Sequence, residues 1–365
     1  MPARFHADQV GSLLRPAAVL EARRRRAEGT LSAEGLREIE DAAVATAFAM
    51  QREVGLHIYS DGEFRRAAFL SEMAAAVDGF VTEKIAMRWF GPGGGEEASA
   101  AQVVGARLQQ RRRLTANEVP FLKAHAPGPF KVCVPSATLF TDVSFKPGLT
   151  DQFYGSRAEL LDELVGIVRN EIAGLVADGV PYVQIDAPRY AYYIDERIRG
   201  DLTASGRNLD EAFSQAVDAD NASLAGVVRA GTTIALHLCR GNSASRWFAE
   251  GGYDRIAERL FGSLNVDAFL LEYDSERSGN FEPLRFIPKG KTVVLGLIST
   301  KTPELESQDE LIQKIEAAAK VVPLENLALS PQCGFASIAV GNLLTADDQR
   351  RKLELLVDTA HKVWG

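Results

Sequence analysis

A histidine and a cysteine stand two positions apart in the segment LHLCRG, as His237 and Cys239. The apolar residues before them predict a strand, in which side chains two residues apart point to the same face. An imidazole and a thiolate on one face provide two ligands for a metal ion. A lone pair of this kind is also compatible with ordinary core packing.

Two more residues of ligand type end apolar runs: Glu272 follows DAFLL, and Cys333 lies in SPQCGF. A carboxylate is costly to bury without a partner, and a cation is one such partner. With the histidine and cysteine above, these residues form a four-coordinate set for Zn²⁺, because soft sulfur ligands disfavour magnesium and calcium. The alternative for Glu272 is a salt bridge with Arg240 or Arg277.

The elements that must position these residues follow a repeating pattern. Short β-rich apolar runs alternate with stretches of helical spacing, which is typical of parallel β/α units. The predicted strands are 8–14, 57–63, 130–137, 182–188, 232–239, 266–275, 292–300 and 327–334. The predicted helices are 32–54, 156–179, 209–230, 251–263, 307–320 and 345–363, with Ser32 and Thr345 as N-caps.

This alternation predicts an α/β protein with a single (β/α)₈ TIM barrel over residues 1–365. Barrel enzymes gather catalytic groups at the carboxyl ends of their strands. The ligand-type residues end the fifth, sixth and eighth predicted strands, so we expect them at this mouth.

Residues 81–129 depart from the alternation. They contain FGPGGGEE, which lacks the lysine and the serine or threonine of a phosphate-binding loop. We expect an excursion on the barrel rim, either a lid or a plain connecting insertion.

Composition limits the classes of function. A net charge of −8 and a pI near 5.4 argue against a general nucleic-acid binder. Three scattered cysteines predict a reducing compartment, and Cys133, inside an apolar run, is expected to be a buried small hydrophobe. No apolar stretch suits a signal peptide or a membrane span of roughly 20 residues. We therefore expect a cytoplasmic protein without nucleic-acid or membrane partners.

Taken in order, these residues resemble the catalytic barrel of the cobalamin-independent methionine synthases, a family within the uroporphyrinogen-decarboxylase-like TIM barrels. The matching segments are VGS (10–12), DGEFRR (61–66), QIDAP (184–188), HLC (237–239), LE (271–272) and SPQCG (330–334). The resemblance implies that Zn²⁺ is held by His237, Cys239, Glu272 and Cys333. It also implies methyl transfer to the thiol of homocysteine, which forms methionine.

The family's homocysteine site maps onto Gly11, Ser12, Glu63 and Asp186. Two carboxylates suit an α-ammonium group, while a backbone N–H and a hydroxyl suit an α-carboxylate. The alternative for the two carboxylates is a rim salt bridge with Arg65, Arg66 or Arg189.

One segment departs from the family. The folate-dependent members of the family carry Asp-x-His-Ser-Pro after the seventh strand, and this histidine acts as an acid. This chain reads LISTKTPELE and has Lys301 at the position of the histidine. A lysine of ordinary pKa is a poor proton donor at neutral pH. The donor is therefore left open between a methyltetrahydrofolate type and another compound. The large N-terminal barrel of the long methionine synthases is also missing, which predicts a short, core-only form.

Two alternatives remain. One is zinc-dependent alkyl transfer to a different thiol, as in the related epoxyalkane:coenzyme M transferases. The other is a non-catalytic protein that binds zinc or a thiol, since four protein ligands commonly form a closed structural site.

Overall fold

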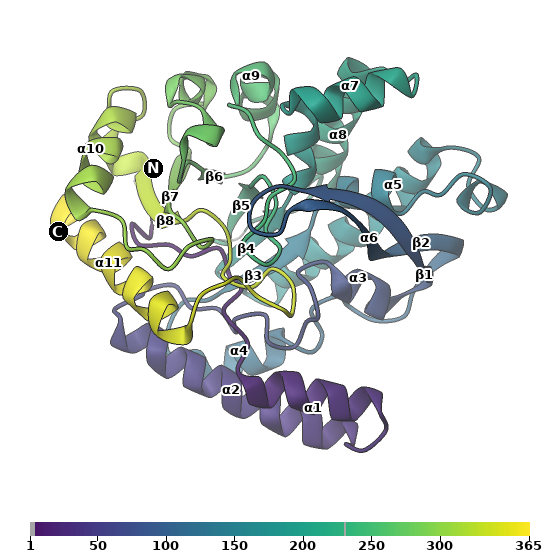
Figure 1. Ribbon diagram of the computed structural model, residues 1–365, viewed down its shortest axis with the longest axis horizontal. Coiled ribbons are helices and arrows are strands. Elements are labelled where there is room, and N and C mark those ends of the chain that lie inside the picture. The colour runs from purple at the N-terminus through teal and green to yellow at the C-terminus, as the bar shows by residue number, and fades with distance from the viewer. Residues whose placement is uncertain (1–3, 230) are drawn as a thin grey trace.

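The centre of the protein is a parallel sheet, seen in a computed structural model that describes residues 4–229 and 231–365. Six strands are hydrogen-bonded in chain order, from β3 to β8 (Figure 1). Their bounds are β3 Lys131–Pro135, β4 Tyr182–Asp186, β5 Thr233–Leu238, β6 Ala268–Glu272, β7 Thr292–Ile298 and β8 Leu327–Pro331. Each lies within a predicted strand.

Two N-terminal segments close this sheet into a barrel. Ala7 forms a parallel bridge with Leu329 of β8, and Tyr59 forms one with Phe130, just before β3. The two segments join each other where a backbone N–H of the first donates to a carbonyl of the second. The predicted barrel is confirmed.

The predictions of regular strands over 8–14 and 57–63 were wrong, since the chain forms isolated bridges there, at Ala7, just before the first segment, and at Tyr59. The backbone leaves the extended conformation at Gly11, with φ of 136°, and at Gly62, with φ of 67°. Such values favour glycine and interrupt a ladder of hydrogen bonds.

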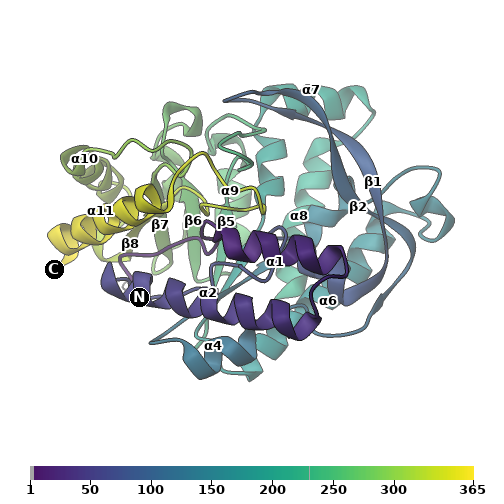
Figure 2. The ribbon, with the colours of Figure 1, turned by 60° about the horizontal axis from the view of Figure 1, so that its bottom comes forward.

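Helices cover the outside of the barrel (Figures 1 and 2). The longer ones are α1 Ala17–Ala27, α2 Ala33–Glu53, α6 Arg157–Ala177, α8 Leu209–Ser223, α9 Asp254–Ser263, α10 Gln308–Ala319 and α11 Ala346–Trp364. The shorter ones are α3 Ser71–Ala76, α4 Val119–His125, α5 Phe140–Val143 and α7 Glu196–Ala204. Short 3₁₀ helices are η1 Ala137–Leu139, η2 Thr150–Gln152, η3 Pro188–Tyr193, η4 Glu276–Ser278, η5 Glu282–Phe286 and η6 Leu324–Asn326. Among the described residues, no helix is both long and apolar enough to cross a membrane.

The helix predictions hold, with shifted ends. The segment predicted as 209–230 ends its helix at Ser223, and its predicted last residue lies outside the described residues. Ser32 accepts a hydrogen bond from the Gly35 N–H, and Thr345 forms a capping box with Asp348.

The core has two parts. A large cluster of buried apolar side chains packs the barrel against its helices. A small cluster inside the barrel is made of Val10, Ile58, Tyr182, Ala235, Ala268, Leu270, Val294 and Ala328. Layers of this kind fill the interior of (β/α)₈ barrels and leave the strand ends for polar groups.

The excursion at 81–129 contains most of a long antiparallel hairpin. Strand β1 (Val77–Trp89) pairs with β2 (Gly95–Gln110), and the hairpin arches in front of the barrel strands (Figure 1). Phe90, at its tip, exchanges backbone hydrogen bonds of 2.7 and 3.1 Å with Trp247 in the loop after β5. Glu97 accepts two hydrogen bonds of 3.0 Å from Arg246 in the same loop.

Candidate metal and substrate site

Three donor side chains converge at the mouth of the barrel. His237 lies in β5, Cys239 directly follows this strand, and Cys333 lies in the turn after β8. Among the described residues, their donor atoms form a group within 4.8 Å of one another, and all three side chains are buried. The structure thus brings together three of the four predicted ligands.

The chemistry of this cluster fits a metal ion. Neither ring nitrogen of His237 has a hydrogen-bond partner of nitrogen or oxygen, although both are buried. Buried polar atoms without a partner are rare and need an explanation, and a metal ion supplies one. The Cys239 thiol and the His237 ring lower the pKa of Cys333 well below its usual value, against the effect of burial. An imidazole beside a thiolate and a second thiol is a donor set that suits zinc.

Glu272 ends β6 but has other partners. Its Oε1 lies 2.9 Å from Nη2 of Arg277, and its Oε2 accepts the backbone N–H of Arg240 at 2.8 Å. Burial would raise the pKa of Glu272, but the charges of Arg240, Arg277 and Lys301 lower it. The salt bridge with Arg277, expected as the alternative to a metal, is present in the structure.

A second cluster lies beside the first. Glu63, Cys133 and Asp186 have ligand-type atoms within 4.8 Å of one another, and all three are buried. Glu63 and Asp186 line the same cavity as His237 and Cys239. Sequence reasoning expected the two carboxylates at one site, and the structure brings them together, but it did not place Cys133 with them. The pairing of β3 with β4 explains this position. Cys133 lies opposite Gln184, and Gln184 and Asp186 point to the same face of β4, so Cys133 lies on the face that carries Asp186.

Both carboxylates hold protons more tightly than usual. Burial raises the pKa of Glu63 to about 8, against the opposing charge of Arg66. Burial also raises the pKa of Asp186 to about 6, against the effects of His237 and Gln184. One Oε atom of Glu63 is buried without a hydrogen-bond partner. A cationic ligand would satisfy this group.

Of the arginines expected as alternative partners, Arg66 forms a long ion pair with Glu63. Arg66 lies 3.9 Å from Glu63 but forms its short contacts, of 2.5 and 2.6 Å, with Glu118. The pair of Arg65 with Asp41 spans 2.5 Å. The Arg189 guanidinium lies 3.6 Å from the ring centroid of Tyr192.

The glycines of two motifs allow close approach at the site. A Cβ on Gly11 would lie 2.8 Å from Cys133 Sγ, and φ at this position is 136°. A Cβ on Gly334 would lie 1.9 Å from Ser12 Oγ. The segments VGS and SPQCG are therefore in direct contact, and Ser12 lines the cavity.

Lys301 contacts the loop that follows β5. Its Nζ donates to the carbonyl of Gly241 at 2.8 Å and to Asn242 Oδ1 at 3.0 Å. Burial lowers its pKa, against the attraction of Glu272. Gly241 and Asn242 line the cavity, so the lysine supports a cavity wall.

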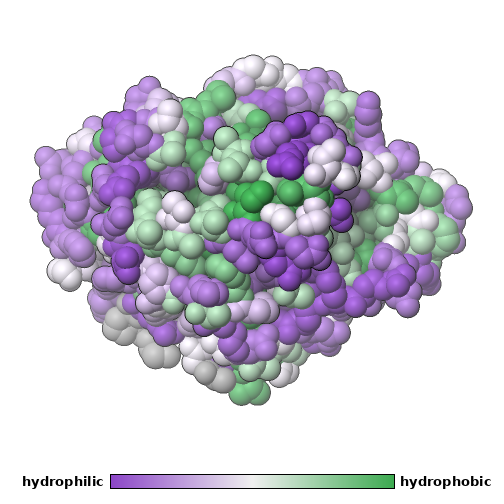
Figure 3. All heavy atoms as spheres, turned by 90° about the horizontal axis from the view of Figure 1, so that it is seen from below, coloured by the Kyte–Doolittle hydropathy of each residue, from purple (hydrophilic) through white to green (hydrophobic). Residues whose placement is uncertain are grey.

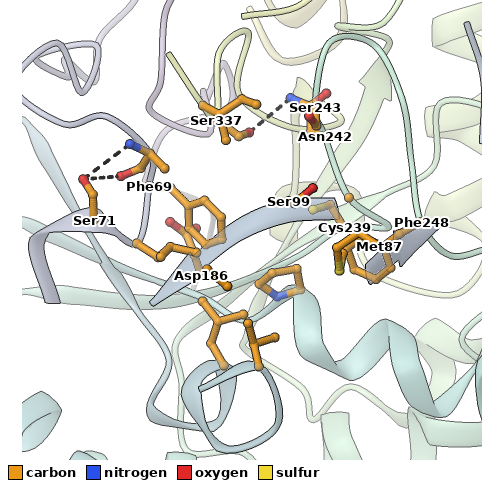
Figure 4. A pocket seen from close by; sticks show the side chains of 18 of the residues that line it. Phe69, Ser71, Met87, Ser99, Asp186, Cys239, Asn242, Ser243, Phe248 and Ser337 are labelled. Atoms are coloured by element: carbon orange, nitrogen blue, oxygen red, sulfur yellow. Dashed lines mark hydrogen bonds between the residues drawn. The ribbon is translucent and has the colours of Figure 1, made fainter. Parts of the chain in front are cut away.

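The cavity has a volume of about 710 Å³, and much of its lining is apolar. Figure 4 shows Cys239 beside Met87 of the hairpin and Phe248 of the loop after β5, and Asp186 close to Phe69. The hairpin also contributes Ile85 and Trp89. Apolar residues appear at the surface in the middle of one face, among hydrophilic ones (Figure 3). The sequence did not identify this hairpin wall.

Comparison with known proteins identifies the family of the chain. A sequence profile described as "Cobalamin-independent synthase, Catalytic domain" matches residues 5–362. The uncharacterized protein YxjH of Bacillus subtilis is 34% identical, over 99% of this chain and 95% of that protein. A methionine synthase of Thermococcus kodakarensis is 27% identical, over 89% of this chain and 85% of its own length.

A solved structure shares the fold. It is a B12-independent methionine synthase from Shewanella sp. W3-18-1 in complex with selenomethionine, with a TM-score of 0.76 and 20% identity, covering 99% of this chain and 98% of that one. The matched profile spans almost the whole barrel, including every residue of both clusters. This chain therefore belongs to the cobalamin-independent methionine synthase family, and it is a methyltransferase with an α/β barrel fold.

Proposed function

We propose that the protein transfers a methyl group to the thiol of homocysteine and so forms methionine. One observation carries this proposal: a single cavity is lined by the soft donors His237, Cys239 and Cys333 and by the buried carboxylates Glu63 and Asp186. The first group suits a thiol-activating metal, and the second suits the amino group of the acceptor.

His237, Cys239 and Cys333 would hold Zn²⁺, with Glu272 as the fourth ligand. Bound zinc lowers the pKa of a coordinated thiol and fixes its sulfur, which makes a thiolate available at neutral pH. Glu272 lies one strand from β5 and is already ionised beside Arg277, so it is ready to serve as a ligand.

The acceptor's α-amino group would lie between Glu63 and Asp186, and its α-carboxylate near Gly11 and Ser12. A thiol that carries a sulfonate, such as coenzyme M, has no ammonium group that could pair with the two buried carboxylates. Burying them without a cation is costly, so the cavity favours an amino-acid thiol.

The donor would occupy the apolar part of the cavity beneath the hairpin. In the transfer, the thiolate sulfur attacks the methyl carbon, the bond from this carbon to the donor's leaving atom breaks, and the leaving atom takes up a proton. Lys301 is the candidate proton donor by its place in the sequence. Its Nζ would first have to leave the carbonyl of Gly241. The donor can be a methyltetrahydrofolate or another methyl compound.

Two relatives support this proposal. The Thermococcus protein carries the name methionine synthase, and the Shewanella protein was solved with selenomethionine, a close analogue of methionine.

The test is a donor screen. Zinc-loaded protein is incubated with homocysteine and with methyl donors that include mono- and triglutamyl methyltetrahydrofolate and S-methylmethionine, and methionine is identified by mass. We expect methionine from at least one donor, and none from the Cys333→Ser variant. Absence of methionine with every donor would overturn the proposal.

Two parallel measurements address the alternatives. Turnover with coenzyme M but not with homocysteine would indicate the other transferase class. An unchanged sulfur count at the zinc edge in X-ray absorption, after homocysteine is added, would indicate a closed structural site.

A further inference from the structure

A lysine is buried inside the barrel beneath the acceptor site. Lys131 of β3 is 2% exposed. Its Nζ lies 2.7 Å from Asp8 Oδ1 and 3.0 Å from Gln184 Oε1, and it also donates to the Gln9 carbonyl. The ammonium group lies 4.5 Å from the ring centroid of Tyr182. Burial of a lysine is costly unless each of its donors finds a partner, and here several acceptors surround it.

Gln184 connects this lysine to the acceptor site. Its Oε1 faces Lys131, while its Nε2 donates to the Val10 carbonyl at 2.7 Å and to Asp186 Oδ1 at 2.8 Å. An amide accepts at one end and donates at the other, whereas an ammonium group can only donate. Lys131 at one end and the Val10 carbonyl at the other therefore hold Gln184 with its donating end toward Asp186.

Asp186 is the residue at which this chain of contacts reaches the cavity. It ends β4, lines the cavity, and lies in the cluster with Glu63. A carboxylate held at one oxygen by a fixed amide keeps a single orientation. Binding of an ammonium ligand then costs less conformational entropy, because the carboxylate is already fixed in one orientation.

We propose that Lys131 and Gln184 are positioning residues for the acceptor, which orient Asp186 to receive the α-ammonium group. The inference rests on the proposed function, because it requires Asp186 to bind this group. It assigns a role in selecting the acceptor to two residues that lie below the cavity. A role in barrel packing alone would affect all thiols equally.

The test compares two acceptors that differ in one group. Homocysteine and 4-mercaptobutyrate share the thiol, the chain length and the carboxylate, but the second lacks the amino group. Their dissociation constants are measured by calorimetry on zinc-loaded wild-type protein and on the variants Gln184→Met and Lys131→Met. Circular dichroism and a thermal melt establish that each variant is folded.

Wild-type protein should prefer homocysteine. Gln184→Met should reduce this preference by about tenfold or more, which is the size expected for a lost hydrogen bond to a charged group. The affinity for 4-mercaptobutyrate should change little. Lys131→Met should act in the same direction, because Gln184 then loses the donor that holds its Oε1 in place. In turnover, KM for homocysteine should rise while kcat at saturation is kept.

A matched control is Glu171→Gln, which alters a fully buried polar side chain of α6 that bonds to Arg113. It should leave the preference for homocysteine unchanged. If wild-type protein shows no preference for homocysteine, both the proposed function and this inference fail. If wild-type protein prefers homocysteine and both folded variants keep that preference, only the inference fails. If Lys131→Met does not fold, Gln184→Met alone decides.

Discussion

Arg277 holds Glu272 by two nitrogens, with Nε at 3.0 Å and Nη2 at 2.9 Å from the same carboxylate oxygen. The carboxylate is fully buried, so without a metal ion this guanidinium is its main side-chain partner. A metal ion bound to Glu272 would also neutralise the charge of this carboxylate.

We therefore expect Arg277→Met to destabilise metal-free protein more than zinc-loaded protein. Breaking a buried pair costs about 3 kcal/mol, and bound zinc would offset part of this loss. The thermal shift caused by zinc should be larger in the variant than in wild type. The exposed Arg285, replaced in Arg285→Met, provides the control. Equal losses with and without zinc would show that Glu272 is not a ligand.

The acceptor site gives a second prediction. Glu63→Gln keeps the shape of the side chain but cannot ionise, whereas the Glu63 carboxyl, with its pKa raised to about 8, would lose its proton when an ammonium group binds beside it. We expect the affinity for homocysteine to fall by about 10- to 100-fold, as for a charge-assisted hydrogen bond. A thiol without an amino group should bind as it does to wild type. Unaltered homocysteine binding would rule out Glu63 as an ammonium ligand.

Contact between two motifs gives a third prediction. Gly334→Ala places a methyl group 1.9 Å from Ser12 Oγ, so the serine must move. We expect a loss of about 1–3 kcal/mol in the free energy of unfolding and a higher KM for homocysteine. Ser12→Gly in the same chain should restore part of the stability. Gly166→Ala, in α6, has open space around the new methyl group and should not destabilise.

The hairpin wall gives a fourth prediction. Met87 lines the cavity, whereas the preceding Ala86 is exposed on the other face of β1. Met87→Glu introduces a charge beside the proposed donor, so we expect KM for the donor to rise at least tenfold. KM for homocysteine should be kept. Ala86→Glu adds the same charge outside and should change neither constant; a similar effect of both variants would contradict the donor's placement.

A fifth prediction concerns pH and stability. Asp220 of α8 accepts hydrogen bonds of 2.6 Å from Ser136 and from Tyr190, yet burial raises its pKa from 3.8 to about 6. The folded state therefore binds this proton more tightly than the unfolded state. The stabilisation is complete below pH 3.8 and is lost as the pH rises to about 6.

The loss amounts to about 3 kcal/mol. Asp220→Asn should remove this part of the pH dependence. Urea denaturation at pH 4 and pH 7 gives the change in the free energy of unfolding of each protein. The difference between the changes of wild type and variant is the contribution of Asp220. Identical pH dependence in the two proteins would contradict a raised pKa.

Much of the barrel could be predicted because its strands are buried on both faces and read as apolar runs separated by helical spacing. The pair His237 and Cys239 was recognisable because the two-residue period of a strand places both on one face. The first two barrel segments could not be predicted as they are, since Gly11 and Gly62 turn the chain out of the extended conformation.

Other features depend on contacts between distant segments. Cys133 looks like a core residue in its own apolar run, and its position beside Asp186 follows from the pairing of β3 with β4. Strand β2 has few strongly apolar residues, but Ile85, Met87 and Trp89 alternate with exposed residues in β1, a strand signal that sequence reasoning missed. The position of the hairpin over the cavity depends on Trp247 and Arg246, more than 130 residues further along the chain.

The hairpin is a sheet of its own, and its backbone bonds run between its two strands and to loops. No strand pairing among the described residues joins it to β3–β8. Side chains on its inner face can therefore be exchanged without moving the strand ends that carry the metal donors. If the proposed sites are right, the residues that contact the methyl donor and those that activate the thiol lie on separate segments of backbone, so the choice of donor can change while thiol activation is kept.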